Sequence, residues 1–328
     1  MSLAKFIQTL SIIGVVAALA VSSRAQQYPS KPIRIVIGFP AGSASDAIAR
    51  LYGQKMSEIL GAPVIVDNKP GASQLVAIGT LQSAPPDGYT LFLGTGSSLA
   101  QGPGVRTDLP YDPLKDFSLV GSISTSPGAI TVHPSLPVHT IRDLINFAKA
   151  NPDRLSYSSA GFGSAGHLDG EYFMYLTGTK MVHVPYKADS EAMREVAAGT
   201  VQVGMTTVQF VISLFQSGKV RPLAAIATRR LASLPSVPTV AEVDIKGLEG
   251  MVPYTFYGLV GPSGLPPAVA NQLSDALATV GAMPDVVSRL QEVSYGEPMT
   301  GTRDAFRGFL QKQIAKWREL GKSVTLTY

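Results

Sequence analysis

The sequence predicts an α/β protein of two domains with a cleft between them. Strands, loops rich in Gly and Ser, and helices alternate over the first hundred residues. They give way to a looser stretch at 101–118 and an extended crossing at 119–134, and the alternation resumes at about residue 155. This alternation is typical of βαβ units and parallel strand pairing. A chain of 328 residues is long enough for two such domains. We therefore expect two lobes, each a mixed, mostly parallel sheet flanked by helices.

The first 25 residues have the composition of a secretory signal peptide. Lys5 provides a positive start, residues 6–21 are mostly apolar, and Ser23-Arg24-Ala25 places small residues at the cleavage positions. The apolar run is short for a membrane-spanning helix, which makes an uncleaved anchor the less favoured alternative. We expect cleavage after about Ala25 and export of the mature protein to the periplasm.

Three repeats of strand, loop and helix predict the first lobe. Apolar and β-branched runs indicate the strands, and apolar residues spaced three to four apart indicate the helices. In chain order the segments are a strand in 28–39, a helix at 47–60, a strand and Gly loop in 62–73, a helix at 74–84 and a strand at 89–94. Loops 40–46 and 95–98 follow the first and third strands. Loops at the carboxyl ends of parallel strands are where ligands bind in such sheets.

The pattern restarts after an extended crossing at 119–134. Thr140 and Asp143 form a near capping box at the start of a helix in 140–152. The segments that follow are strands at 155–160, 181–186, 201–207 and 220–228, and helices at 167–178, 189–199 and 208–218.

A return strand at 256–262 and two closing helices, at 266–281 and 303–320, complete the predicted elements. The expected division is residues 26–125 plus about 252–302 for lobe 1 and residues 126–251 for lobe 2. The C-terminal segment, 303–328, is expected to pack across both lobes.

A glycine motif in the second lobe raises the question of a dinucleotide. The run Gly161-Phe162-Gly163-Ser164-Ala165-Gly166 matches G-x-G-x-x-G. That interpretation requires an acidic residue about twenty positions on, and Asp189 is the nearest, at a longer spacing. A similar loop, 38–46, opens the first lobe. Two facing loops fit a small molecule held between the lobes better than a dinucleotide, and a purely structural turn is the other alternative.

No catalytic or metal-binding machinery is visible in the sequence. Ser164 is not the nucleophile of a G-x-S-x-G elbow, because Phe162 stands two residues before it. No pair of His residues has the spacing of metal ligands, and the chain contains no Cys. A net charge of +4 without a dense Lys/Arg block does not predict nucleic-acid binding. We expect no enzyme activity, no cofactor, no metal and no nucleic-acid partner.

Several side chains near the loops have both a structural and a functional interpretation. Asp46 is interpreted first as a helix N-cap, and Asp189 either as an N-cap or as the partner of a cationic group on the ligand. His167 lies either beside the cleft or in the core, whereas His183, between two valines of a strand, is expected to be structural. The tyrosines that either line the cleft or pack in the core are Tyr186, Tyr254 and Tyr257.

The chain resembles a known family over nearly all of its mature length. The segments that carry the resemblance are residues 28–50, 63-PVIVDNKPGAS-73, 86-PDGYTLFLG-94, 109–120, 155–173, 183-HVPYK-187, 234-LPSVPTVAE-242 and Trp317. They resemble the Bug family, the periplasmic solute receptors of tripartite tricarboxylate transporters. The resemblance implies a two-lobed Venus-flytrap fold with a hinge, and a small carboxylate ligand held by backbone amides and water. It also implies delivery of that ligand to integral-membrane transporter subunits, and we expect a monomer.

The resemblance also implies which residues bind the ligand. Carried over position by position, the expected ligand-binding residues of the two loops are Phe39, Ala41, Gly42, Ser43, Asp46, Ser159, Ala160, Gly161 and Ser164, to which Thr95 and Asp189 are added. The sequence departs from the family pattern at Ser43 and Ser73, which stand where the family has glycine. One hypothesis is that one of these hydroxyls bonds directly to the ligand.

Other functions are left open by the sequence. A ligand-sensing co-receptor of the same fold is one alternative, and an exported α/β hydrolase is a less favoured one. The ligand classes left open are dicarboxylates, aromatic carboxylates, amino acids and nicotinate-like acids.

Overall fold

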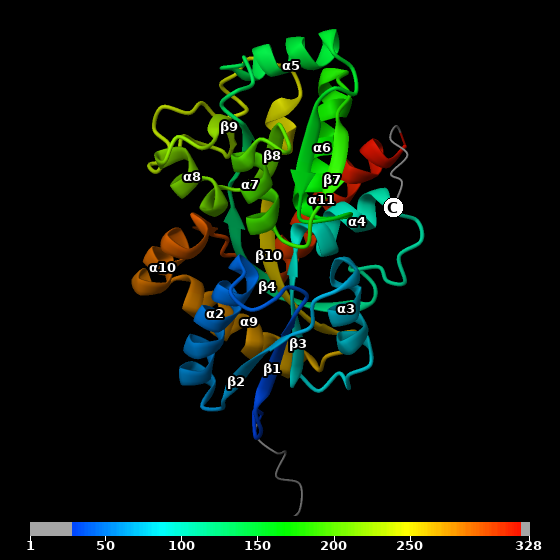
Figure 1. The fold of residues 1–328 in the computed structure, drawn as a ribbon. Coiled ribbons are helices and arrows are strands. Elements are labelled where there is room, and N and C mark those ends of the chain that lie inside the picture. The colour runs from blue at the N-terminus through cyan, green and yellow to red at the C-terminus, as the bar shows by residue number, and fades with distance from the viewer. Residues whose placement is uncertain (1–27, 323–328) are drawn as a thin grey trace, which may run out of the picture.

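The computed structural model describes residues 28–322 of the chain. The predicted signal peptide and its cleavage site lie outside the described residues. Two lobes are arranged one above the other, and strands β4 (Phe117–Ser126) and β10 (Thr255–Pro262) run toward the junction between them (Figure 1). The predicted two-lobed α/β fold is confirmed.

Lobe 1 is built on a six-stranded sheet with the order β11-β4-β10-β3-β1-β2. The strands not yet introduced are β1 (Ile33–Ile37), β2 (Val64–Asn68), β3 (Thr90–Thr95) and β11 (Glu297–Pro298). β1 pairs in parallel with β2 and β3, and β10 is antiparallel to both β3 and β4. β10 therefore joins the early parallel strands to the rest of the sheet.

Helices cover both faces of this sheet because its strands are apolar on both sides. Ile33, Ile35 and Ile37 of β1 face one core, while Val36 faces the other. The first core contains α2 (Ala44–Leu60), α9 (Pro267–Gly281) and α10 (Pro284–Ser294). The second contains α3 (Leu75–Gln82) and α11 (Arg303–Gly321). Strands buried on both faces read as continuous apolar runs, which is the pattern that predicted them.

Lobe 2 has a five-stranded sheet with the order β7-β6-β8-β5-β9. Its strands are β5 (Gly128–Val132), β6 (Ser156–Ser159), β7 (Val182–Pro185), β8 (Val203–Thr207) and β9 (Arg221–Ile226). Helices α5 (Ile141–Ala150) and α6 (Ala165–Thr177) pack on one core, and α7 (Asp189–Ala198) and α8 (Ile212–Gln216) pack on another. The predicted box at Thr140 is complete, since Thr140 Oγ1 accepts from the Asp143 amide and the Asp143 carboxylate accepts from the Thr140 amide.

The structure differs from the sequence prediction in four places. The extended stretch 119–134 is two strands, β4 and β5, which belong to different sheets and are separated by Pro127. The predicted loop 95–98 continues into a π-helix, η2 (Ser97–Gln101), and the looser stretch begins with the short helix α4 (Gly102–Val105). Helix α10 was not predicted, although Pro284 in its first turn and Asp285 beside it are helix-start signals. The sheets are mixed as expected, but antiparallel pairs are at least as numerous as parallel ones, because β5 and β10 each run antiparallel to both neighbours.

The chain passes from one sheet to the other between Ser126 and Gly128, and it re-enters the first sheet at Thr255. The residue-by-residue division into domains stays a prediction. Within residues 28–322, no helix combines the length and the apolar character needed to cross a membrane.

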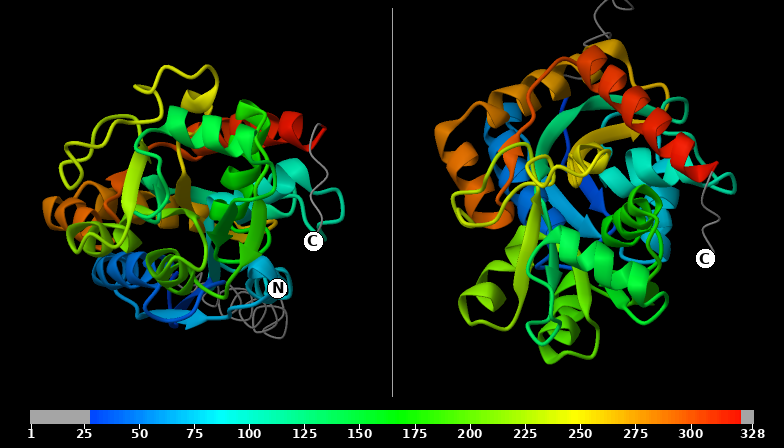
Figure 2. Two further views of the ribbon diagram at one scale, coloured as in Figure 1. Left: turned by 45° about the horizontal axis from the view of Figure 1, so that its top comes forward. Right: turned by 90° about the horizontal axis from the view of Figure 1, so that it is seen from above.

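Helix α11 contacts elements of both lobes. Trp317 is buried among Leu168 and Tyr172 of α6 and Val105 of α4. Its approach to α4 depends on Gly104, because a Cβ there would lie 2.4 Å from the Trp317 Cβ. The views in Figures 1 and 2 both place α11, drawn in red, alongside α4. The last described helix thus packs against parts of the chain that lie in separate lobes.

Candidate functional site

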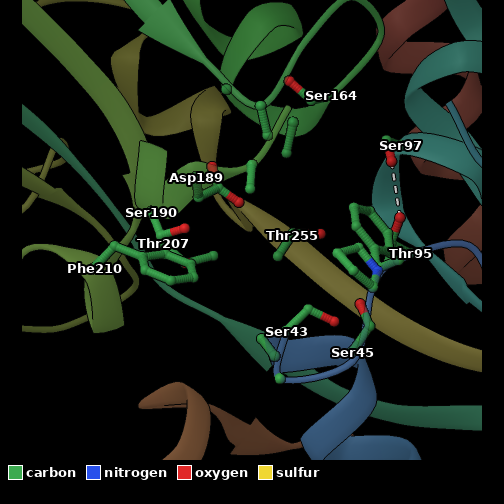
Figure 3. Close-up of a pocket in the computed structure, with 18 of the residues that line it drawn as sticks. Ser43, Ser45, Thr95, Ser97, Ser164, Asp189, Ser190, Thr207, Phe210 and Thr255 are labelled. Atoms are coloured by element: carbon green, nitrogen blue, oxygen red, sulfur yellow. Dashed lines mark hydrogen bonds between the residues drawn. The ribbon is translucent and has the colours of Figure 1, made fainter. Parts of the chain in front are cut away.

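A cavity of about 240 Å³ lies between the two lobes. Loops of lobe 1 contribute residues 39–45, Thr95 and Ser97 to its lining. Loops of lobe 2 contribute Ala160, residues 164–166 and 187–190, Thr207 and Phe210. The segment that enters β10 contributes Tyr254, Thr255 and Tyr257. Figure 3 shows hydroxyl-bearing side chains facing one another across it. The cavity is smaller than the pockets that hold drug-sized molecules, so it suits a small solute.

Most of the residues predicted to bind the ligand line this cavity. They are Phe39, Ala41, Gly42, Ser43, Thr95, Ala160, Ser164 and Asp189. Three predicted residues do not line it, namely Asp46, Ser159 and Gly161. Each of these three residues supports a cavity loop on the side that faces away from the cavity.

Asp46 holds the first loop in place. Its carboxylate accepts hydrogen bonds from the Gly42 amide (3.0 Å), Arg50 Nε (3.0 Å) and Asn68 Nδ2 (3.0 Å). Burial alone raises the pKa of Asp46, but the bonds from Arg50, Gly42 and Asn68 outweigh it and lower that pKa below the usual range. Asp46 is also not the N-cap of α2, because Ser43 Oγ accepts from the Asp46 amide (3.2 Å).

Ser159 and Gly161 form the back of the second loop. Ser159 Oγ lies 2.7 Å from His183 Nε2 and accepts from the Gly161 amide (3.2 Å), where a φ of +102° turns the chain. His167 Nδ1 accepts from the Gly163 amide (3.1 Å). Both histidines therefore serve the loop rather than line the cavity, as was expected for His183.

These two histidines are uncharged at neutral pH. Burial, with a smaller effect of His183, lowers the pKa of His167 to about 3, and burial lowers that of His183 to about 4. The two side chains that support the second loop therefore carry no positive charge that could compete with the cavity for an anion.

Three helices begin at the cavity wall. Ser43 caps α2, Ser164 caps α6 by accepting from the His167 amide (3.4 Å), and α7 begins after Ala188. The amino ends of helices carry unsatisfied N–H groups and a partial positive charge. The convergence of α2, α6 and α7 therefore gives the cavity the character of an anion site without Arg.

Charged side chains are scarce in the lining, where Lys187 and Asp189 are the charged residues. Asp189 Oδ1 accepts from Thr206 Oγ1 (2.8 Å), and burial raises the pKa of this carboxyl. Tyr254 and Tyr257 line the cavity, whereas Tyr186 does not.

Seven polar or aromatic lining residues were not predicted. They are Ser45, Ser97, Lys187, Ser190, Thr207, Phe210 and Thr255. Thr207 ends the predicted strand 201–207, so its place at a strand terminus was a usable signal. Thr255 begins β10 at the junction of the lobes, a position that depends on the pairing of β10 with β3 and β4 and has no local signal.

Metal binding has no support in the part of the chain that the structure describes. Within it, no group of three or more His, Asp or Glu side chains is arranged to hold an ion.

Ser73 connects the two lobes instead of lining the cavity. Its hydroxyl donates to the carbonyl of Phe162 (2.6 Å), in the second loop. Ser73 lies between Ala72 and Gln74, and all three have positive φ values, of 52°, 45° and 76° respectively. The hypothesis of a direct ligand contact thus finds no support at Ser73, while Ser43 lines the cavity and stays a candidate.

Replacing Ser73 with Ala should loosen the contact between the loops. A net hydrogen bond contributes about 0.5–1.5 kcal/mol, so the amides of residues 160–164 should exchange with solvent a few-fold faster in the absence of any solute. Hydrogen exchange followed by mass spectrometry measures this directly. Ser83→Ala is the matched control, because the Ser83 hydroxyl bonds to Gly79 of its own helix. Equal exchange in wild type and Ser73→Ala would show that the bond does not hold the loop.

Comparison with known proteins places the chain beside periplasmic solute-binding proteins. Residues 48–326 match the family described as tripartite tricarboxylate transporter family receptor, TctC. The chain is 35% identical over 304 residues to the UPF0065 protein in the gbd 5' region of Cupriavidus necator, covering 92% of this chain and 89% of that protein. Its structure is similar to that of R. palustris Rpa4515 with adipate (30% identity, TM-score 0.80, 90% of this chain and 98% of that one). It is also similar to the periplasmic binding protein BugD (28% identity, TM-score 0.78, 90% and 98%).

Proposed function

The chain belongs to the tripartite tricarboxylate transporter receptor family of solute-binding proteins, and from this premise we propose that it captures a small carboxylate between its lobes. The proposal extends to delivery of that solute to the membrane subunits of a tripartite transporter. The members of this family and the structural neighbours are binding proteins, not enzymes.

The observation that carries the proposal is the convergence of three helix amino ends on one cavity. Helices α2, α6 and α7 direct partial positive charge and free N–H groups toward the same small volume. Hydrogen bonds from such donors to an ionised group are stronger than bonds between neutral groups. The relative from R. palustris was determined with adipate, which is a carboxylate of suitable size.

Capture requires the lobes to move relative to one another. The strands that pass between them, β4 and β10, and the segment around Pro127 are the places where a hinge motion would be absorbed. In the proposed cycle the solute enters between open lobes, the loops close on it, and the closed form docks on the permease. The amino-terminal signal proposed for residues 1–25 would bring the receptor to the periplasm.

Thermal unfolding of residues 26–328 with a library of carboxylates tests the proposal. A ligand that binds only the folded state raises the melting temperature in proportion to ln(1 + [L]/Kd) at saturating concentrations. We expect the melting temperature to rise with the logarithm of concentration for at least one carboxylate. Its uncharged amide, such as adipamide beside adipate, should give none. A rise with sugars or amines alone, and with no carboxylate, would overturn the assignment.

A further inference from the structure

The walls of the cavity differ in electrostatic character. On one side, α2 and α6 begin at Ser43 and Ser164 with their positive ends toward the cavity. Neither helix places a carboxylate at the cavity. Asp46 of α2 lies behind the loop, where it is bonded to Gly42, Arg50 and Asn68. The first turn of α6 contains no acidic residue. On the other side, Asp189 is the first residue of α7, so its carboxylate offsets the positive end of that helix, and it points into the cavity (Figure 3).

Asp189 has no cationic partner among residues 28–322. Its carboxylate accepts a hydrogen bond from Thr206 through Oδ1, although a carboxylate accepts up to about four hydrogen bonds. Lys187, the other charged residue of the lining, is exposed and forms no ion pair with Asp189 in the described chain. Asp189 is partly buried, and burial of a carboxylate without a positive partner is unfavourable, so the unused oxygen is suited to a cationic group that arrives with the solute.

Thr207 provides a second, independent indication of a polar ligand group at this wall. It is only 7% exposed, and in the described chain its Oγ1 has no hydrogen-bond partner. Buried hydroxyls are normally bonded, so an orphan facing a cavity indicates a missing polar partner. Figure 3 shows Thr207 on the same side of the cavity as Asp189. An ammonium group has three N–H donors, enough to bond both a carboxylate oxygen and a hydroxyl.

The neighbouring titratable groups do not supply this missing charge. Tyr254 and Tyr257 of the crossing segment face the same cavity, and burial raises the pKa of both phenols, that of Tyr257 to about 12. They are neutral at pH 7 and cannot neutralise a carboxylate. Apart from Lys187, whose side chain is exposed, Asp189 faces uncharged residues in the lining.

We propose that Asp189, with Thr207, forms a subsite for a protonated amine, so that the solute is an amino carboxylate rather than a simple carboxylic acid. Its carboxylate would lie at the amino ends of α2 and α6, and its ammonium would lie against Asp189. The inference rests on the proposed function, because it assumes that the same cavity takes the carboxylate.

Matched solutes that differ only by an amino group test the subsite. Calorimetric titration at pH 7 would compare L-glutamate with glutarate, L-2-aminoadipate with adipate, and L-phenylalanine with 3-phenylpropionate. We expect wild type to bind the amino member of at least one pair about 10- to 100-fold more tightly, the range given by a hydrogen bond to a charged group. Asp189→Asn should abolish that preference, because its amide is isosteric with the carboxylate but uncharged. Asp153→Asn, the same change at an exposed residue of lobe 2 that does not line the cavity, should keep it.

The outcomes separate this inference from the proposed function. If wild type prefers the acids without an amine, and Asp189→Asn binds them equally well or better, the amine subsite is wrong and the carboxylate receptor stands. A second outcome also overturns the inference. If the affinity of wild type for such an acid falls as the pH rises, and the affinity of Asp189→Asn does not, then Asp189 acts as a protonated donor. Binding of no member of any pair, and of no other carboxylate, would overturn the proposed function itself. Because wild type alone reports the preference, a misfolded variant cannot hide the result.

Discussion

Replacing Trp317 with Ala is expected to lower the free energy of unfolding by about 3–5 kcal/mol, the range for removing a buried aromatic side chain. Trp317 is 2% exposed and packs between α6 of lobe 2 and α4 of lobe 1. Its removal leaves a cavity that Gly104, which has no side chain, cannot fill. Urea denaturation followed by circular dichroism measures the change, since fluorescence would be lost with the only Trp of the chain.

The control for this prediction is Trp317→Phe, which keeps an aromatic ring among Leu168, Tyr172 and Val105. It should lose clearly less stability than the Ala variant, because less volume is removed. A Trp317→Ala protein with the midpoint and slope of wild type would mean that α11 does not stabilise the fold through this contact.

Replacing Asp46 with Ala is expected to cost about 2–3 kcal/mol and to weaken binding of the captured carboxylate about tenfold or more. The stability loss follows because the buried carboxylate bonds to Arg50, Asn68 and the Gly42 amide, and a bond to a charged group contributes about 1.5–3 kcal/mol. The binding loss follows because Gly42 and Ser43 line the cavity and would lose their anchor.

The pH dependence of stability identifies the charge of Asp46 as the cause. Its folded pKa is lowered, so its contribution is fully present above the unfolded value, about 3.9 for Asp, and is lost as the pH falls through the lower folded value. The difference in unfolding free energy between wild type and Asp46→Asn should thus be constant from pH 7 to about 5 and shrink below about pH 4. A difference that stays constant down to pH 3 would assign the effect to packing alone.

Most of the fold could be predicted because its signals are local. The apolar runs of β1 and β3, the Thr140 capping box and the spacing in α2 each depend on a few neighbouring residues. The switch of sheets at Pro127 could not, because the partners of β5 are β8 and β9, some 70 to 100 residues away. A continuous apolar run gives no sign of which sheet it will join.

The candidate site was predicted in outline but not in the direction of its side chains. Strand ends fix the positions of the loops, and the family resemblance pointed to Ser43, Ala160 and Ser164 within them, all of which line the cavity. Whether a loop residue faces the cavity or supports it from behind depends on tertiary partners. Asp46 turns toward Arg50 and Asn68, and Ser159 turns toward His183. The neighbouring residues in the sequence indicate neither of these pairings.

The place of β10 in the lobe 1 sheet sets the order in which the chain can complete its fold. β10 lies between β3 and β4, so that sheet stays divided until residues 255–262 have been synthesised. All strands of lobe 2 lie within residues 128–226 and are available earlier. A nascent chain can therefore complete the second lobe first, while the sheet of β1, β2 and β3 still has an unpaired edge at β3. During that interval β3 has one unpaired edge and β4 has neither of its neighbours, so both strands are exposed to mispairing with another chain.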